Sequence, residues 1–284
     1  MRPIFIIGAG RSGTKFLRDT LAASPEVSRI PYDVGYIWRY GNEGLEHDEI
    51  NADSVGPRQL DWIRKQLPRL VDKKIKKPGA RFIVEKSVPN SLRPQLLYKA
   101  FPDALFVHIV RDGRAVAESA IRLWKAPTDK GYLFDKIRYF PWANFKYALW
   151  FVRNRLFSRR KKTIAIWGPR YSGIQKDVSE LPLHEVCARQ WMKCVQVTEQ
   201  QLSTVPSDQV FMLRYEELMR DPQTVKALCD WVGVGSEFVM TAYENNIEPG
   251  NNEKWKDRLS GSRLDDINRI FSEEPELARK YCRG

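Results

Sequence analysis

The chain has 284 residues, of which 43% are hydrophobic and 29% are charged. This length suits one domain with a sizeable core, and the composition excludes a wholly disordered chain. The net charge of +12 and the pI near 9.5 indicate an anionic partner.

Export signals and cysteine-based sites are not expected in this sequence. The first apolar run, Ile4–Ile7, is too short for a signal-peptide core, and no run approaches the ~18 apolar residues of a spanning helix. We therefore expect a cytoplasmic protein. The four cysteines show no C-x-x-C spacing and the three histidines lie far apart, so neither a disulfide scaffold nor a zinc site is expected.

Short apolar runs alternate along the chain with segments of helical periodicity. Strands are predicted at 3–7, 81–84, 104–110 and 209–213. Helices are predicted at 14–23, 91–101, 114–124, 183–205 and 222–232. Such alternation is typical of a parallel sheet with helices on both faces, so we expect an α/β fold of three layers, α/β/α, in a single domain over residues 1–284.

A glycine-rich turn, Gly8-Ala9-Gly10-Arg11-Ser12-Gly13, joins the first strand to the first helix. Backbone N–H groups and the helix dipole hold a phosphate at such a turn. The turn matches G-x-G-x-x-G, and Asp33 lies 20 residues beyond Gly13, as in the dinucleotide-binding fingerprint. However, Pro31 disfavours the central strand that would have to deliver Asp33.

Two other interpretations of this turn concern its phosphate chemistry. Gly8 and Gly13 have the spacing of a Walker A loop, but that loop continues with Lys and then Ser or Thr, whereas the order here is Thr14-Lys15. This order misplaces the hydroxyl for Mg²⁺ and disfavours a metal-dependent kinase. The remaining interpretation takes Arg11-Ser12-Gly13-Thr14 as a phosphate cradle that supplies its own cation; the simplest alternative is a tight turn with an exposed arginine.

A second basic motif, Arg111-Asp112-Gly113-Arg114, follows the third predicted strand, and Ser119 comes eight residues after Arg111. The carboxyl ends of parallel strands meet at the edge of the sheet where ligands bind. Two basic sites at one edge suit a ligand with two separated phosphates. We expect Asp112 to cap the following helix and Arg114 to point to solvent.

Together these motifs resemble the sulfotransferases that use 3′-phosphoadenosine 5′-phosphosulfate (PAPS), in particular bacterial sulfotransferase-domain proteins and the tyrosylprotein branch. Residues 11–14 look like the loop for the 5′-phosphosulfate, and residues 106–114 with Ser119 look like the site for the 3′-phosphate. Residues 213–222 resemble the family's later strand, turn and helix. Lys254-Trp255 resembles the late Lys-Trp of the tyrosylprotein branch, which leaves only 125–180 without a counterpart.

The resemblance implies a P-loop-like fold, PAPS as the co-substrate and no metal. It also implies that Arg11 and Lys86 stabilise charge on the leaving phosphate, as in phosphoryl transfer. The residues that it assigns to binding of the donor are Arg11, Ser12, Gly13, Thr14, Lys15, Arg111, Ser119, Tyr215, Lys254 and Trp255.

An acceptor hydroxyl must lose a proton, which asks for a general base. Asp33 is the first candidate, because the resemblance places a glutamate of the tyrosylprotein sulfotransferases at almost this position. Glu85 and His184 are the alternatives. The structural role open to Asp33 is an ion pair with Arg39, and His108 is expected to be buried in the third strand.

Residues 130–170 hold eleven Lys and Arg, one acid (Asp135) and eleven aromatic residues, so most of the excess charge lies in this segment. Three interpretations stay open: a membrane-surface element, a platform for an acidic or glycan acceptor, and an ordinary insertion. We favour an acceptor-side element that brings the protein to an anionic lipid surface. No nucleic-acid-binding motif accompanies the aromatics, so nucleic acid is not an expected partner.

The sequence therefore predicts a PAPS-dependent sulfotransferase that acts on a hydroxyl or amine of a carbohydrate, lipid or small molecule. Two alternatives come from other classes. One is a P-loop kinase for a nucleotide or small molecule, and the other is a non-catalytic nucleotide-binding protein.

Overall fold

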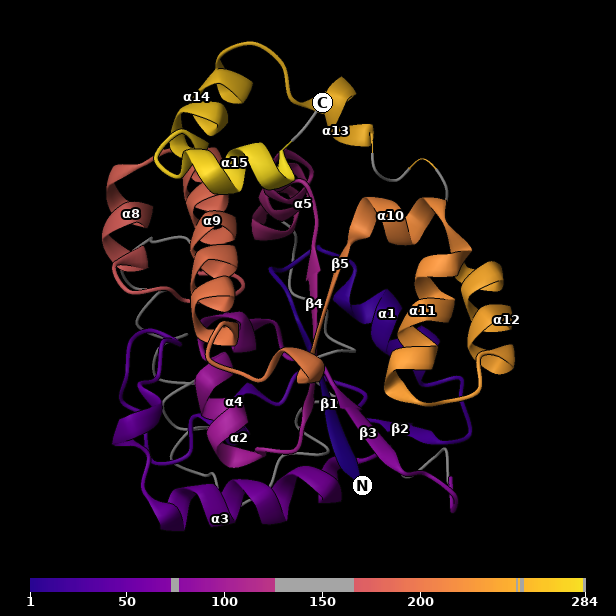
Figure 1. The fold of residues 1–284 in the computed structure, drawn as a ribbon. Helices are drawn as coiled ribbons and strands as arrows, with labels where there is room; N and C mark the ends of the chain where they lie inside the picture. Colours follow the sequence, from indigo (N-terminus) through magenta and orange to yellow (C-terminus); the bar gives the residue numbers. More distant parts are fainter. Residues whose placement is uncertain (73–76, 126–165, 249, 251–252, 283–284) are drawn as a thin grey trace.

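The computed structural model describes residues 1–72, 77–125, 166–248, 250 and 253–282. Its centre is a five-stranded parallel sheet with the strand order β2-β3-β1-β4-β5. The strands are β1 (Arg2–Ile7), β2 (Val27–Arg29), β3 (Phe82–Glu85), β4 (Leu105–Val110) and β5 (Val210–Arg214). Figure 1 shows helices on both sides of the sheet, so the predicted three-layer fold is confirmed.

Helices cover the two faces of the sheet in different numbers (Figure 1). One face packs against α1 (Thr14–Leu21), α10 (Tyr215–Arg220), α11 (Pro222–Val232) and α12 (Glu237–Asn246). The other face and its flank hold α2 (Gly35–Trp38), α3 (Pro57–Gln66), α4 (Pro94–Ala100), α5 (Gly113–Lys125), α8 (Ile174–Glu180), α9 (Leu183–Leu202), α13 (Lys254–Arg258), α14 (Ser262–Phe271) and α15 (Pro275–Tyr281). Short 3₁₀ helices lie at Ala52–Ser54, Leu67–Leu70, Val88–Leu92 and Ser207–Gln209.

The apolar run of the central strand β1 is continuous because its side chains are buried on both faces of the sheet. Successive side chains of a strand point to opposite faces of the sheet. Ile4 and Ile6 pack on the side of α1, and Phe5 and Ile7 pack on the side of α2 and α4. Because helices cover both faces, every position in the strand's interior must be apolar.

Strand β2 was not predicted. It has three residues, Val27-Ser28-Arg29, and among the described strands it pairs with β3 alone, at the edge of the sheet. A short edge strand shows no apolar run that periodicity could detect. Its position also contradicts the dinucleotide-binding interpretation, because β3 lies between β1 and β2, whereas that fold places the second strand beside the first.

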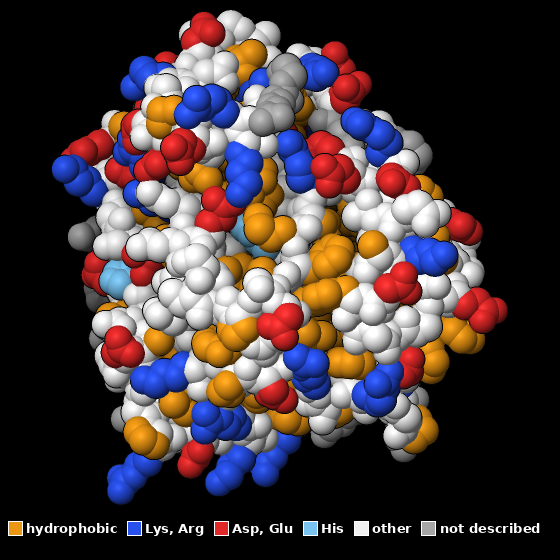
Figure 2. Space-filling view, viewed as in Figure 1, with side chains coloured by type: hydrophobic (Ala, Val, Ile, Leu, Met, Phe, Trp, Pro, Cys, Tyr) orange, Lys and Arg blue, Asp and Glu red, His pale blue; other side chains and the backbone are white. Residues whose placement is uncertain are grey.

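The opposite edge of the sheet is β5. Figure 2 shows hydrophobic side chains gathered at the centre of the face on which β5 lies, with charged side chains around them, and Met212 of β5 is 49% exposed. Within the described ranges, no helix combines the length and the apolar character needed to cross a membrane. Most of the basic aromatic segment at 130–170 lies outside the described residues, so its contact with a membrane surface or an acidic glycan stays a prediction.

Candidate anion-binding and catalytic site

The turn between β1 and α1 needs glycine at both ends. A Cβ atom at Gly8 would lie 2.5 Å from the backbone oxygen of Ile109, and one at Gly13 would lie 2.5 Å from the ring of Tyr215. Gly13 also has a φ of +85° and Arg11 has a φ of 72°, both in the left-handed region that favours glycine. The turn is therefore held in a constrained shape against β4 and the start of α10.

Within this turn, the hydroxyl of Ser12 is buried without a hydrogen-bond partner among the described residues. Buried polar groups are nearly always hydrogen-bonded, and an unsatisfied one is costly. A ligand oxygen in the turn would satisfy this hydroxyl. Thr14 is also buried, whereas Lys15 is exposed.

The two predicted basic motifs meet. Arg11 Nε donates a hydrogen bond to Ser119 Oγ at 2.9 Å, and Arg111 Nη1 donates to the backbone oxygen of Arg11 at 3.1 Å. The Arg111 guanidinium also lies over the ring of Tyr215, with its central carbon 4.4 Å from the ring centroid. Trp191 of α9 donates from Nε1 to the backbone oxygen of Arg111 at 3.0 Å. The expectation that both motifs share one edge of the sheet is confirmed.

Burial and mutual repulsion act on these two arginines. Burial lowers the pKa of both guanidinium groups, and the charge of Arg111 lowers the pKa of Arg11 further. Arginine nevertheless stays protonated in proteins. The Arg11 side chain is exposed and that of Arg111 is half-buried. Two neighbouring positive charges that repel each other are stabilised by an anion between them, so the arrangement favours a phosphate ligand.

The same arginines line a pocket whose other walls come from α5 and α13. Its lining residues are Arg11, Arg111, Ala115, Glu118, Ser119, Arg122, Lys254 and Trp255. Ala115, Glu118 and Arg122 were not predicted from the sequence motifs. The spacing of 115, 118, 119 and 122 places them on one face of a helix, which was the signal available to find them.

Helix α13 reaches the pocket through a contact that contradicts one prediction. Arg114 does not point to solvent: it is 8% exposed, and its guanidinium carbon lies 4.4 Å from the centroid of the Trp255 ring. Asp112 accepts a hydrogen bond from Arg114 Nη2 at 2.6 Å and caps α5 by accepting from the Arg114 backbone N–H at 2.8 Å. The prediction for Asp112 is confirmed. The prediction for Arg114 is wrong because Trp255, from a distant segment, covers it.

Asp33 and Lys86 form an ion pair, with Oδ1 2.9 Å from Nζ. Both side chains are largely buried. A Cβ atom at Gly10 would lie 3.5 Å from a methyl carbon of Val88, so the segment after β3 packs against the glycine-rich turn. The alternative pairing of Asp33 with Arg39 is wrong, because Arg39 pairs with Asp48 at 3.0 Å.

The two other candidates for a general base lie elsewhere. Glu85 is fully buried and accepts hydrogen bonds from Ser87 and Asn90, so it does not face an acceptor. His184 lies at the start of α9, where its Nε2 is 3.0 Å from Asp266 Oδ2. His108 is buried in β4 as expected, and burial lowers its pKa to about 4.

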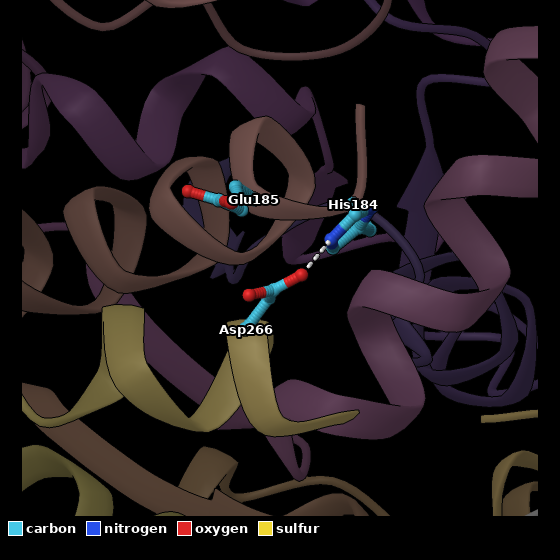
Figure 3. Close-up of side chains that lie close together, drawn as sticks. All are labelled: His184, Glu185 and Asp266. Atoms are coloured by element: carbon cyan, nitrogen blue, oxygen red, sulfur yellow. Dashed lines mark hydrogen bonds and ion pairs between the residues drawn. The ribbon is translucent and has the colours of Figure 1, made fainter. Parts of the chain in front are cut away.

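His184, Glu185 and Asp266 lie close enough together to suggest a metal site (Figure 3). However, Arg269 Nη2 lies 2.9 Å from Glu185 Oε1 and 3.4 Å from Asp266 Oδ1. A guanidinium group therefore already balances the two carboxylates. The cluster is explained as an ion-pair network that joins α9 to α14.

Trp167 is a further residue whose role was not predicted. A Cβ atom at Gly10 would lie 3.1 Å from the indole ring of Trp167, so this ring packs on the glycine-rich turn. Gln190 of α9 donates from Nε2 to the backbone oxygens of Trp167 at 2.9 Å and of Pro169 at 2.8 Å. Helix α9 thus holds Trp167 beside the turn. In the sequence, Trp167 is one of several aromatic residues in a basic segment, and this pattern does not indicate where the side chain lies in the fold.

Comparison with known proteins gives the family. A sequence model described as "Sulfotransferase family" matches residues 3–140 and 137–237. Protein-tyrosine sulfotransferase 2 of Gallus gallus is 25% identical over 256 residues, which cover 87% of this chain and 55% of that protein. Omega-hydroxy-beta-dihydromenaquinone-9 sulfotransferase Stf3 of Mycobacterium bovis is 32% identical over 88 residues, which cover 31% of this chain and 22% of that protein. The chain thus spans little more than half of one relative and less than a quarter of the other.

Solved structures share the fold. The sulfotransferase domain from the curacin biosynthetic pathway has a TM-score of 0.53 and 18% identity, with 99% of this chain and 98% of that chain covered. Sulfotransferase STF9 from Mycobacterium avium has a TM-score of 0.57 and 14% identity, with 99% and 76% covered. Because the family model matches most of the chain, from β1 to the start of α12, the protein belongs to the sulfotransferase family.

Proposed function

We propose that this sulfotransferase transfers the sulfuryl group of PAPS to a hydroxyl group of an acceptor molecule. One observation carries the proposal: Arg11 and Arg111, from two separate strand ends, converge on one pocket. PAPS carries a phosphosulfate at the 5′ position of its ribose and a phosphate at the 3′ position. Two separated anionic groups need two cationic sites, and arginine suits phosphate recognition.

The glycine-rich turn suits the 5′ end of the donor. Its backbone N–H groups precede α1, and the buried hydroxyl of Ser12, which has no partner within the described part of the chain, is available to a ligand oxygen. Thr14 is buried in the same turn. Lys15 is exposed, so its contribution would come from its backbone N–H rather than from its ammonium group.

The part of the pocket formed by residues after β4 suits the 3′-phosphate. Arg111 and Ser119 line it, and Lys254 and Trp255 of α13 complete the wall. Tyr215 supports the Arg111 guanidinium and contacts the turn at Gly13, so it would act beside the nucleotide through these two residues. The donor would thus bridge the motif after β1 and the motif after β4.

In the transfer step, the bond between sulfur and the bridging oxygen of the donor breaks, and a bond between sulfur and the acceptor oxygen forms. The acceptor proton passes to the carboxylate of Asp33. Adenosine 3′,5′-bisphosphate leaves with the electron pair on its phosphate oxygen, where Arg11 and Lys86 stabilise the charge. Lys86 also holds Asp33 in place through their contact of 2.9 Å.

Calorimetry tests the donor. We expect adenosine 3′,5′-bisphosphate to bind without added metal, and more tightly than ATP with Mg²⁺. Tighter binding of ATP with Mg²⁺ would overturn the proposal in favour of a kinase.

A transfer assay tests catalysis. Radiolabelled PAPS is supplied with p-nitrophenol, a methyl glucoside, a long-chain alcohol and a tyrosine-containing peptide, and we expect label on at least one of them. Binding of the bisphosphate with no transfer to any of these acceptors and no release of sulfate to water would favour the non-catalytic alternative.

A further inference from the structure

Glu85, the last residue of β3, is a fully buried carboxylate that the proposed reaction does not use. Its Oε1 accepts a hydrogen bond from Ser87 Oγ, and its Oε2 accepts one from Asn90 Nδ2 at 2.9 Å. The oxygen of the Asn90 amide accepts from Arg93 Nε at 3.0 Å. The Asn90 amide is thereby oriented with its NH₂ group toward Glu85, so two donors face the carboxylate.

Ser87 extends this network to the turn that carries Asp33. The hydroxyl of Ser87 accepts a hydrogen bond from the backbone N–H of Val34 at 2.7 Å. A hydroxyl has one proton to donate, and Ser87 donates it in the hydrogen bond to Glu85. The bonds run in one direction, from Val34 through Ser87 to Glu85, and consecutive bonds of this kind strengthen one another.

Two contacts therefore join the same two segments. Val34 directly follows Asp33, and Ser87 directly follows Lys86. One contact is the ion pair of Asp33 and Lys86 at 2.9 Å, and the other is the bond from the Val34 backbone to Ser87 at 2.7 Å. The ion pair alone would let the Asp33 turn pivot about a flexible lysine side chain, whereas the second contact fixes the backbone.

We propose that Glu85 is a positioning residue for the Asp33–Lys86 pair and acts through Ser87 on the turn that carries Asp33. The inference rests on the proposed function, in which Asp33 takes the acceptor proton and Lys86 stabilises the leaving phosphate. Glu85 itself is enclosed and touches neither reactant. Its effect is to hold the base and the cation at a fixed separation beside the glycine-rich turn.

The ionisation of Glu85 determines the pH at which its role should be tested. Burial raises its pKa to about 7, the hydrogen bond from Ser87 opposes this rise, and the charges of Asp33, Arg93 and Lys86 also act on it. At pH 8 the carboxylate is ionised and accepts both bonds. Glutamine at this position has the same shape but one acceptor oxygen and one NH₂ group, so it cannot accept from both Ser87 and Asn90.

Three variants separate positioning from stability. Glu85→Gln and Ser87→Ala each interrupt the path to Val34, and the second does so even if the first fails to fold. Ser91→Ala is the matched control: Ser91 is equally buried in the adjoining 3₁₀ helix, but its hydroxyl donates to the backbone oxygen of Val88 and does not contact Glu85.

The readout is NMR of the native protein at pH 8, using the backbone amide of Val34 and the side-chain ammonium of Lys86. We expect both signals to move in Glu85→Gln and in Ser87→Ala, and neither to move in Ser91→Ala. A purely structural Glu85 would lower the stability of the fold without changing the Lys86 signal of the folded form. An unchanged Lys86 ammonium signal in both interrupted variants would overturn the proposal.

The turnover of PAPS is a second measurement on the same variants. In the two interrupted variants we expect kcat to fall by on the order of tenfold to 10²-fold, the size expected from a small misplacement of reacting groups. Affinity for adenosine 3′,5′-bisphosphate should stay at the wild-type value. Failure of the wild-type protein to bind this bisphosphate would instead contradict the proposed function, and it would leave the NMR comparison of Glu85 intact.

Discussion

Arg111 and Arg11 are separated by 100 positions in the chain, yet the Arg111 guanidinium donates a hydrogen bond to the Arg11 backbone oxygen at 3.1 Å. Arg11 in turn donates from Nε to Ser119 Oγ at 2.9 Å. The side chain of each basic motif thus contacts the other motif. A ligand held at one end of the pocket is therefore coupled to the geometry of the other end.

Replacing either cation near the leaving phosphate should reduce turnover. We expect Arg11→Ala and Lys86→Ala each to lower kcat by about 10²–10³-fold, because removal of one preorganised donor costs ~2.7–4 kcal/mol in the transition state. Steady-state transfer from PAPS measures this. Arg64→Ala is the control, since it removes the same charge from α3, which lies at the opposite end of the molecule from α5 and α13 (Figure 1). Wild-type turnover in Arg11→Ala or Lys86→Ala would remove that residue from the mechanism.

Gly13→Ala should disable the turn. The added Cβ would lie 2.5 Å from the Tyr215 ring, and alanine at a φ of +85° is strained by roughly 1–2 kcal/mol. Because Tyr215 supports Arg111, we expect calorimetry to show at least about a tenfold loss of affinity for adenosine 3′,5′-bisphosphate, equivalent to about 1.4 kcal/mol. Gly44→Ala is the control, since no atom of the described residues lies within 4 Å of a Cβ there. Equal affinities in the two variants would contradict the account.

Trp255→Ala should weaken binding of the donor through the wall of the pocket. The change removes the stacking of Arg114 on Trp255, a contact worth about 0.5–2 kcal/mol, and frees the segment that carries Lys254. We expect calorimetry to show weaker binding of the bisphosphate. Trp231→Ala removes a partly buried tryptophan of α11, which packs on Phe211 away from the pocket, and serves as the control. Binding that Trp255→Ala leaves unchanged would show that α13 takes no part in the site.

Several parts of this architecture could be predicted from the sequence because they are local. The run at 3–7 is apolar throughout, and that at 104–110 is apolar except for His108, because helices bury both faces of β1 and β4. Arg11 and Arg111 lie in the turns after β1 and β4, and the rule for parallel sheets places such positions together. Ser119 lies further on, within α5. The edge strand β2 was missed because three residues carry no periodic signal.

The remaining contacts depend on which distant segments meet. Asp33 pairs with Lys86 because β2 lies beside β3, an order that neither segment shows by itself. Arg114 was wrongly assigned to solvent because Trp255, from a segment late in the chain, covers it. These pairings follow from the packing of the whole domain, and periodicity within one element does not reveal them.

Stability should depend on pH through Glu85. Burial raises its pKa in the folded protein from 4.5 to about 7, so between these values the folded state binds more protons than the unfolded chain. The free energy of unfolding therefore falls as the pH rises through this window, by at most about 3 kcal/mol relative to Glu85→Gln, which does not titrate. Urea denaturation of both proteins at pH 4.5 to 8 measures the difference. Parallel stability curves for the two proteins would contradict the assignment.

Calorimetry with two nucleotides tests whether Arg111 holds the phosphate on the 3′ position while the glycine-rich turn holds the 5′ end. Adenosine 3′,5′-bisphosphate and adenosine 5′-monophosphate differ only in that phosphate. The wild-type protein should prefer the bisphosphate by about 10- to 10²-fold, as expected for charged hydrogen bonds worth about 1.5–3 kcal/mol, and Arg111→Ala should bind both nucleotides alike. A preference that persists undiminished in Arg111→Ala would contradict the account.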